Sequence, residues 1–314
     1  MNILILNWRD IKHPRAGGAE LRLQEVYAPL VRQGHQVTLY SCSYPNCLKY
    51  EIIDGIKVYR VGLDWTYSLR CFFNLSKWVK KHQSDIVVED LNKLPFYTPL
   101  IYRGPLLIQM HHLWGKSIFK ETVWPIALLV WIAEQSIGWF YRKCRFSVVS
   151  LSTKEELFDL GIPKSSIEVI YNGADLEAYQ PCNQEKQLII FWIARIQKYK
   201  GPIEACKILE LLREDFPELK LVIAGEGPYR KKVEKYAKEK SLPVEFTGFI
   251  DQKEKIKWLQ KSVVHLQSSY KEGWGLTIIE ANACGCPVVA QDTAGLRDSC
   301  QDKQTGLLYR FGDL

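Results

Sequence analysis

The chain has 314 residues, and two domains are expected because single hydrophobic cores stop growing at about 250–300 residues. Its hydrophobic fraction of 47% and its charged fraction of 25% are those of a soluble globular protein. The net charge of +7 is concentrated in the first 170 residues, which hold 21 lysines and arginines against 15 aspartates and glutamates. A basic half of this kind could meet phospholipid, a phosphorylated acceptor or nucleic acid. No nucleic-acid-binding motif accompanies the charge, so nucleic acid ranks last among the partners.

The nine cysteines are scattered without paired spacing, and the closest two, Cys284 and Cys286, are separated by one residue. We interpret them as free, buried thiols in a reducing compartment, and not as disulfides or metal ligands. The opening "MNILILNWRD" is too short, and ends in too much charge, to be a signal peptide. A cytoplasmic protein is therefore expected.

The chain begins with a short apolar run, "MNILILNW", which predicts a buried parallel strand. A polar loop follows, and an amphipathic helix is expected over residues 20–32, with Gly17 and Gly18 at its start. A strand, a glycine loop and a helix N-terminus together form a generic phosphate-facing unit. This unit is not the dinucleotide fingerprint, because the spacing G-x-G-x-x-G is absent.

Further strands are predicted by the runs "GHQVTLYSC", "IKVYRVG", "DIVVEDL" and "GPLLIQM". Residues 74–82 predict a helix with Lys77, Lys80 and Lys81 on one side, and His111 and His112 stand where the last of these strands ends. Ligands of open α/β sheets bind beyond the carboxyl ends of the strands, so His111 could touch substrate. The alternative, which carries more weight for His112, is a histidine satisfied by the loop backbone.

Residues 121–140 are mostly apolar and include four aromatic side chains, Trp124, Trp131, Trp139 and Phe140. The stretch is too short to cross a membrane, and it is broken by Pro125, Glu134 and Gln135. We predict a helix buried within the domain. The alternative is a helix at a membrane interface, because Arg142, Lys143 and Arg145 follow directly.

A polar, proline-containing stretch over residues 171–187 is interpreted as a domain linker. The strand "FSVVSLS" and a helix with Ser152 or Thr153 at its N-cap precede it. After it, the strands "QLIIFWIAR", "LKLVIAGEGP", "VEFTGFI", "VVHLQSS" and "CPVVAQD" alternate with helices, the first over residues 202–216. This alternation predicts a doubly wound α/β domain in each half, over residues 1–170 and 188–314, with a cleft between them as the usual ligand location.

The stretch "KEGWGLTIIEANACGCPVVA" places two carboxylates eight positions apart. Glu272 is expected on a loop with Gly273 and Gly275, and Glu280 within a helix over residues 276–283 that Gly285 ends. The helix N-terminus directs unpaired N–H groups at whatever lies in front of it. The pattern therefore predicts an anion site flanked by two acceptors for hydroxyl groups, which suits a sugar joined to a diphosphate. The alternative is a surface loop with two solvated glutamates.

Several separated motifs resemble those of the retaining, family 4 type glycosyltransferases of the GT-B fold. "EGWGLTIIEA" is similar to the family's E-x7-E signature, and "ARIQKYKG" is similar to its G-R-x4-K-G, with Ala194 in place of the usual glycine. "NGAD" at residues 172–175, "AGEGP", "TGFI" and the early "GGAE" match further landmarks, so the resemblance covers nearly the whole chain. Family members usually continue past "TGLLYRFGDL", so an incomplete C-terminal domain is expected.

The resemblance implies roles for individual residues. Arg195 and Lys200 would stabilise the leaving diphosphate, which gains negative charge as the glycosidic bond breaks, without a metal and without a D-x-D motif. Glu280 would hold the nucleotide ribose, Glu272 would bond hydroxyls of the donor sugar, and His111 would lie near that sugar. The remaining donor-binding residues implied are Gly17, Gly18, Gly273, Trp274, Gly275, Leu276 and Thr277.

The resemblance thus implies a hexosyltransferase that uses a UDP- or GDP-sugar, needs no further cofactor, and retains the anomeric configuration. The basic N-terminal half favours a lipid-linked or cell-envelope glycan acceptor, reached from the cytoplasmic side by a protein peripherally bound to an anionic membrane. Two alternatives stay open. One is a nucleotide-sugar epimerase or hydrolase of the same fold, and the other is a non-catalytic remnant of the fold.

Overall fold

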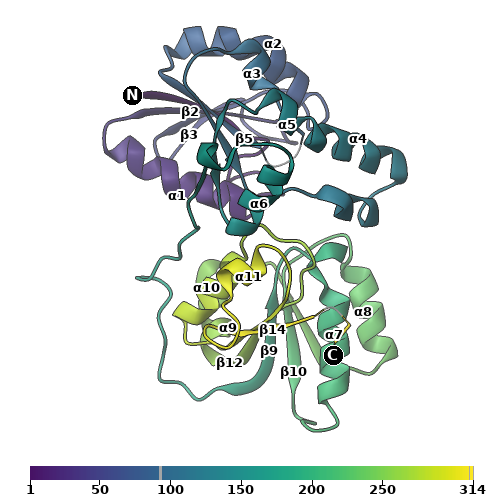
Figure 1. Ribbon diagram of the computed structural model, residues 1–314. Helices are drawn as coiled ribbons and strands as arrows, with labels where there is room; N and C mark the ends of the chain where they lie inside the picture. Colours follow the sequence, from purple (N-terminus) through teal and green to yellow (C-terminus); the bar gives the residue numbers. More distant parts are fainter. Residues whose placement is uncertain (92–93, 311, 314) are drawn as a thin grey trace. The chain divides into compact units, whose positions relative to one another are not determined.

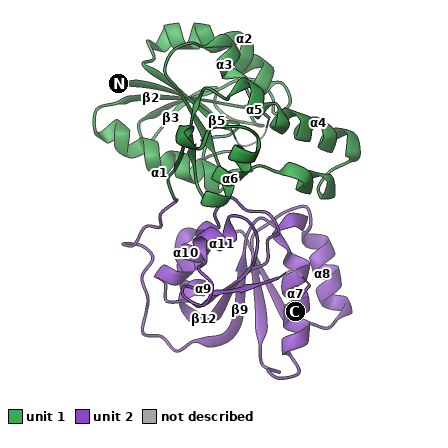
Figure 2. Cartoon of the chain, in the orientation of Figure 1, with its two compact units in different colours: residues 1–171 green, residues 172–314 purple. Residues whose placement is uncertain are grey.

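The computed structural model describes residues 1–91, 94–310 and 312–313. The chain divides into two compact units, unit 1 over Met1–Tyr171 and unit 2 over Asn172–Leu314 (Figure 2). Each unit is one mainly parallel sheet with helices on both faces (Figure 1). The predicted fold class, two doubly wound α/β units, is confirmed. The chain end at Leu314, which bears on the expected incomplete domain, lies outside the described residues.

The strands of unit 1 are β1 (Asn2–Leu6), β2 (Gln36–Ser41), β3 (Tyr50–Ile53), β4 (Ile56–Arg60), β5 (Ile86–Leu91), β6 (Leu106–Met110), β7 (Arg145–Val148) and β8 (Ile167–Val169). Their order across the sheet is β3-β4-β2-β1-β5-β6-β7-β8, and among the residues described in this unit only the pair β3–β4 is antiparallel. The central strand β1 is buried along nearly its whole length. This is why it reads as a continuous apolar run and not as an alternation.

The helices of unit 1 are α1 (Gly18–Arg32), α2 (Tyr67–His82), α3 (Thr98–Ile101), α4 (Trp124–Gln135), α5 (Ile137–Phe140) and α6 (Leu151–Asp159), with the short 3₁₀ segments η1 (Gly115–Lys120) and η2 (Lys164–Ser166). Helix α2 begins seven residues earlier than predicted, because Tyr67, Cys71, Leu75 and Trp78 form one buried stripe. The predicted cap of α6 is also wrong. Ser150 is the N-cap, and its hydroxyl accepts a hydrogen bond from the Thr153 amide at 3.1 Å.

The prediction that residues 121–140 form a buried helix is wrong. Helix α4 buries two small side chains, Ala127 and Ala133, and leaves Trp124 65% and Leu129 60% exposed. Its buried charge, Glu134, accepts hydrogen bonds from the backbone amides of residues 114 and 115 at 2.7 and 2.8 Å. Several of its large apolar side chains are therefore exposed. Figure 1 shows α4 at the edge of unit 1. Over the ranges that the structure describes, no helix is both long and apolar enough to cross a membrane.

The strands of unit 2 are β9 (Gln187–Ile193), β10 (Lys220–Ala224), β11 (Val244–Gly248), β12 (Ser262–Gln267), β13 (Val288–Gln291) and β14 (Leu307–Tyr309). They are all parallel, in the order β11-β10-β9-β12-β13-β14. The helices are α7 (Pro202–Leu212), α8 (Arg230–Glu239), α9 (Gln252–Lys261), α10 (Leu276–Ala283) and α11 (Leu296–Ser299), and the 3₁₀ segment is η3 (Lys198–Lys200). Helix α10 has the bounds that the sequence predicted.

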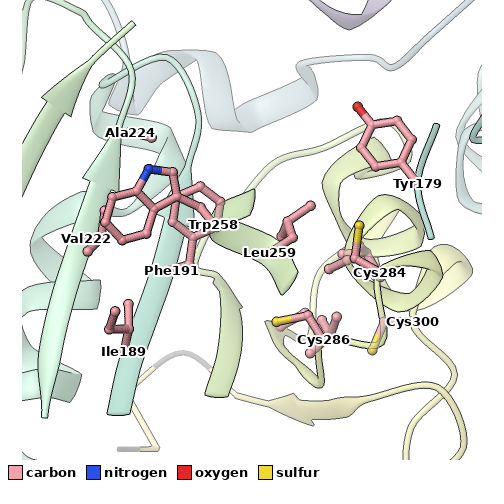
Figure 3. Close-up of a cluster of buried hydrophobic side chains, with 14 of the residues drawn as sticks. Tyr179, Ile189, Phe191, Val222, Ala224, Trp258, Leu259, Cys284, Cys286 and Cys300 are labelled. Carbon is pink, nitrogen blue, oxygen red and sulfur yellow. The ribbon is translucent and has the colours of Figure 1, made fainter. Parts of the chain in front are cut away.

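Alternate residues of β9 divide between two cores. Ile189 and Phe191 pack with α9, α10 and α11, whereas Ile190 and Trp192 pack with α7 and α8. This follows from the two-residue period of a strand, which sends successive side chains to opposite faces of the sheet. Figure 3 shows the first core, in which the ring of Tyr179 packs beside Cys284. Nine cysteines are free, and six of them are buried.

Candidate active site

The strand order of unit 2 places its candidate residues at one end of one sheet. From β9 the chain continues outward through β10 and β11, and it then returns to β12, on the other side of β9. The loops after β9 and β12 therefore leave the sheet side by side, at the switch point where open α/β sheets bind ligands. Arg195 follows β9 by two residues, and Glu272 follows β12 by five.

Lys200 and Glu272 contact each other directly across this switch point. The Lys200 Nζ donates to Glu272 Oε1, and Gln267 Nε2 donates to the same oxygen at 3.1 Å. The side chains are only 16% and 13% exposed. Burial by itself lowers the pKa of Lys200, but the Glu272 carboxylate outweighs this effect and raises the pKa above its ordinary value. The lysine is therefore a fixed positive charge at neutral pH.

Gly201 makes the approach of these loops possible. It adopts a φ of +70°, and a Cβ at this position would lie 2.1 Å from the Ser268 carbonyl oxygen. Ser268 in turn donates hydrogen bonds to the carbonyl oxygens of Lys200 and Gly201, at 3.2 and 2.8 Å. The Lys-Gly pair of the motif is thus held against the end of β12 by backbone contact that excludes any side chain.

Arg195 adds a second positive charge near Lys200. Its side chain is half-buried, and its charge acts to lower the pKa of Lys200, as a neighbouring like charge does. The structure therefore brings Arg195, Lys200 and Glu272 together within unit 2. Two cations beside one carboxylate leave a net positive corner, which suits an anionic group.

Glu280 lies on α10 and is 5% exposed, so the alternative of solvated glutamates is wrong. Its Oε1 accepts from Lys255 Nζ at 2.7 Å and from the Tyr179 hydroxyl at 2.9 Å. Its Oε2 is buried and has no hydrogen-bond partner among the described residues. A buried acceptor without a partner is costly unless something supplies one. The second oxygen of Glu280 is therefore suited to a hydroxyl donor from a ligand.

The loop between the two glutamates is tightly packed. Gly273 and Trp274 are buried, and Gly275 forms the N-cap of α10 with a φ of +82°. A Cβ on Gly275 would lie 2.7 Å from a Leu296 side-chain carbon. Leu276 is the first residue of the helix, and the Thr277 hydroxyl lies 3.5 Å from the amide oxygen of Gln267. The packing of this loop therefore holds the backbone amides in the first turn of α10 in a fixed position at the edge of the switch point.

In unit 1, Gly17 and Gly18 begin α1, as the sequence predicted. The amide of Gly17 donates to the Glu20 carboxylate at 2.7 Å, in the manner of a capping box. This amide is therefore satisfied inside the helix, and a phosphate would meet the amides that follow it.

His111 directly follows β6 and is 7% exposed. Its side-chain partner is not the loop backbone, because its Nε2 lies 3.2 Å from the carboxylate of Asp90 on β5. A carboxylate on one ring nitrogen fixes the orientation of the imidazole. His112 is half-buried, and its ring lies 5.3 Å from that of Trp114.

Four polar residues of these clusters were missed by the sequence reasoning: Asp90, Tyr179, Lys255 and Gln267. Asp90 and Gln267 carried a usable signal, because each is a polar residue at or next to the carboxyl end of a buried strand. Tyr179 and Lys255 carried none, since their partner is distant in sequence. Within the described part of the chain, no three His, Cys, Asp or Glu side chains are grouped so that they could hold a metal ion.

Two families match the chain, one in each half. Residues 16–178 match Glycosyltransferase Family 4, and residues 178–313 match Glycosyl transferases group 1. An uncharacterized glycosyltransferase of Methanocaldococcus jannaschii is 25% identical, over 98% of this chain and 84% of that protein. The alpha-monoglucosyldiacylglycerol synthase of Streptococcus pneumoniae is 23% identical, over 96% and 74%. The structure of Anabaena HepE in complex with UDP-glucose aligns at a TM-score of 0.73 and 19% identity, over 99% and 85%, which shows a shared fold.

Proposed function

The chain belongs to the family 4, group 1 glycosyltransferases, which are retaining enzymes of the GT-B fold, and we propose which donor and which acceptor it uses. The donor is a UDP- or GDP-hexose, and the acceptor is a lipid-linked or cell-envelope glycan. The observation that carries the proposal is the cluster of Arg195, Lys200 and Glu272 at the switch point of unit 2. It combines positive charge for a diphosphate with a carboxylate for sugar hydroxyls.

The reaction breaks the bond between the anomeric carbon of the sugar and an oxygen of the β-phosphate. The acceptor oxygen forms its bond to the same face of the sugar, and the acceptor's proton passes to the departing phosphate oxygen. Negative charge grows on the diphosphate in this step, and Arg195 and Lys200 stabilise it from fixed positions. Glu272, held through Lys200 and Gln267, aligns the sugar hydroxyls.

The nucleotide is held through Glu280, whose buried Oε2 accepts from the ribose hydroxyls. HepE, which shares the fold, has been crystallised with UDP-glucose, and this supports a UDP-sugar as the first donor to test.

His111, oriented by Asp90, lies at the end of a strand of unit 1 and contributes contacts to the donor sugar. Gly18, Gly273, Trp274, Leu276 and Thr277 are assigned to the donor as well, and Gly17 and Gly275 serve as the caps of α1 and α10.

The decisive experiment measures release of nucleoside diphosphate with and without acceptor. A thermal-shift screen against UDP-, GDP- and ADP-sugars first selects the donor, because a ligand that binds only the folded state raises the apparent melting temperature. With that donor, we expect an extract of lipid-linked glycans to raise the rate of diphosphate release at least tenfold. Equal release without acceptor identifies an epimerase or hydrolase, and binding without release identifies a non-catalytic remnant.

The acceptor part of the proposal is supported by two exposed surfaces of unit 1. Helix α4 presents Trp124, Leu129 and Ile132, each more than half exposed, and Arg142, Lys143 and Arg145 nearby in the chain are exposed as well. Helix α2 carries a second surface, an exposed stripe made of Leu69, Phe73, Lys77 and Lys80, with Lys81 beside it. Apolar side chains beside cations favour an anionic bilayer. The alpha-monoglucosyldiacylglycerol synthase that the chain resembles is named for a lipid.

Flotation with liposomes tests this membrane contact. We expect the protein to float with anionic vesicles and less with neutral ones, and the bound fraction to fall as salt screens exposed charges beyond about 10 Å at 0.1 M. Changing Arg142, Lys143 and Arg145 together to Gln should weaken binding by roughly tenfold or more, since each cation near the surface contributes about 1 kcal/mol.

A matched control changes Lys231, Lys232 and Lys235 to Gln, three exposed lysines on α8 of unit 2. This variant should float like the wild type. Equal flotation with neutral and anionic vesicles, or none with either, would contradict the membrane contact and leave an enzyme with a soluble acceptor.

A further inference from the structure

The buried carboxylate of Glu280 is held on one side only. Lys255 on α9 and Tyr179 in the segment before β9 both donate to Oε1, at 2.7 and 2.9 Å. Oε2 is equally buried and has no hydrogen-bond partner in the part of the chain that the structure describes. We propose that Lys255 and Tyr179 are positioning residues, which occupy Oε1 so that Oε2 is presented to the ribose of the donor nucleotide.

This inference rests on the proposed function, because it takes Glu280 as the ribose-binding residue. It adds two residues for which neither the motifs nor the family match gives a role. Both come from elements outside the E-x7-E motif, since Tyr179 precedes Glu280 by 101 residues and Lys255 by 25.

The contacts form a closed triangle. The Lys255 Nζ lies 5.0 Å from the centre of the Tyr179 ring, so the two side chains that hold Glu280 also contact each other. The Lys255 and Glu280 side chains are 17% and 6% exposed, and Tyr179 is 5% exposed. In Figure 3 the Tyr179 hydroxyl points away from Cys284, while the ring packs on the core. A carboxylate held from two directions has little freedom to rotate, and its second oxygen is fixed in space.

Charge gives Lys255 a second effect. The leaving diphosphate is anionic, and an uncompensated carboxylate near it would oppose donor binding. Lys255 balances the charge of Glu280, so the carboxylate can accept from ribose hydroxyls without adding net repulsion. Burial, and then the charge of Glu280, raise the pKa of Tyr179 above its ordinary value. The phenol therefore stays protonated and remains a donor to Oε1 at neutral pH.

The inference predicts a specific loss of ribose recognition. The probe is UDP or GDP, whichever binds more tightly, and its 2′- and 3′-deoxy analogues, with dissociation constants from titration calorimetry. The wild type should prefer the ribonucleotide by about tenfold or more, as expected for hydrogen bonds to a charged group. Lys255→Met and Tyr179→Phe should bring this ratio towards one, and Lys255→Arg should restore much of it. In turnover assays the KM for donor should rise, with kcat within about threefold of the wild type.

The control is Lys253→Met, an exposed lysine two residues earlier on the same segment of chain, which should keep the wild-type ratio.

A purely structural role for Lys255 and Tyr179 would weaken the binding of ribo- and deoxyribonucleotides equally. An unchanged ratio between their dissociation constants in both variants overturns the inference. Should Lys255→Met unfold, Tyr179→Phe carries the test, because it removes one donor to Oε1 and keeps the Lys255–Glu280 contact. Glu280→Gln separates the two proposals. If it abolishes the ribose preference while the other variants leave it intact, the positioning role fails alone. If it leaves the preference intact, the ribose role of Glu280 fails, and the positioning role fails with it.

Discussion

Replacing Arg195 or Lys200 with alanine is expected to lower kcat by about 100-fold or more. Each side chain supplies a fixed positive charge where the diphosphate leaves, and losing one preorganised electrostatic donor of this kind typically has an effect of that size. The measurement is the initial rate of nucleoside diphosphate release at saturating donor and acceptor. Melting temperatures of both variants are needed beside it, because Lys200→Ala leaves the half-buried Glu272 without its cation.

Lys207→Ala is the matched control for this pair. Lys207 lies on α7, one turn beyond the start of the helix that follows Lys200, and its side chain is 49% exposed. It should retain wild-type kcat. Activity within threefold of the wild type for both Arg195→Ala and Lys200→Ala would show that the charge on the leaving group is stabilised elsewhere.

Arg60→Ala should lower the free energy of unfolding of unit 1 by about 3–5 kcal/mol, because it leaves a buried carboxylate without its charged partner. The Arg60 side chain is fully buried, and its Nε and Nη2 donate to the two oxygens of Asp10, both at 2.8 Å. Its Nη1 donates to the Leu48 carbonyl and to Glu51, each at 3.0 Å. The pair ties the end of β4 to the loop after β1. Urea unfolding followed by tryptophan fluorescence measures the loss.

Arg103→Ala, at an exposed arginine of the same unit, provides the comparison and should shift stability by no more than about 0.5 kcal/mol. Acid titration gives a second readout. Burial alone raises the pKa of the Asp10 carboxyl, but the hydrogen bonds and charge of Arg60 outweigh it and hold the pKa below its usual value. Asp10 therefore contributes stability that is complete above its unfolded pKa of about 3.9 and is lost as the pH falls through the lower folded value. Arg60→Ala should reduce this acid-side loss, and an unchanged pH profile would contradict the assigned pair.

In the E-x7-E region, the local sequence was enough to predict the bounds of a helix. Gly275 and Gly285 bracket the residues between them, and Pro287 follows, so the predicted helix over residues 276–283 matches α10 at both ends. The alternation of apolar runs and amphipathic stretches likewise predicted two parallel, doubly wound sheets. The placement of Arg195 after one strand and of Glu272 after another followed from the same pattern. Motif spacing therefore predicted which residues stand at the ends of strands.

The sequence did not predict which face of helix α4 is buried. The sequence of α4 is apolar on nearly every side, so its composition could not tell which side chains find a neighbour. In the structure Ala127 and Ala133 are buried, and larger side chains such as Trp124 and Leu129 stay exposed. The N-cap at Ser150 was missed for a related reason, since Ser150, Ser152 and Thr153 lie close together and satisfy the capping rule equally well.

The sequence by itself determined the elements, the fold class and the set of charged residues available to a nucleotide-sugar. These features depend on residue spacing along the chain. The hydrophobic period sets the type of element, and glycine and proline set where it ends, all within a few residues. Only the tertiary structure decided which of those charges meet. Lys200 meets Glu272 because β9 and β12 are neighbours in the sheet, although 72 residues separate the two side chains. Glu280 meets Lys255 and Tyr179 because α9 and the segment before β9 pack on the same face of that sheet as α10. Contacts of this kind depend on strand order and helix packing, which bring together residues that no local pattern relates.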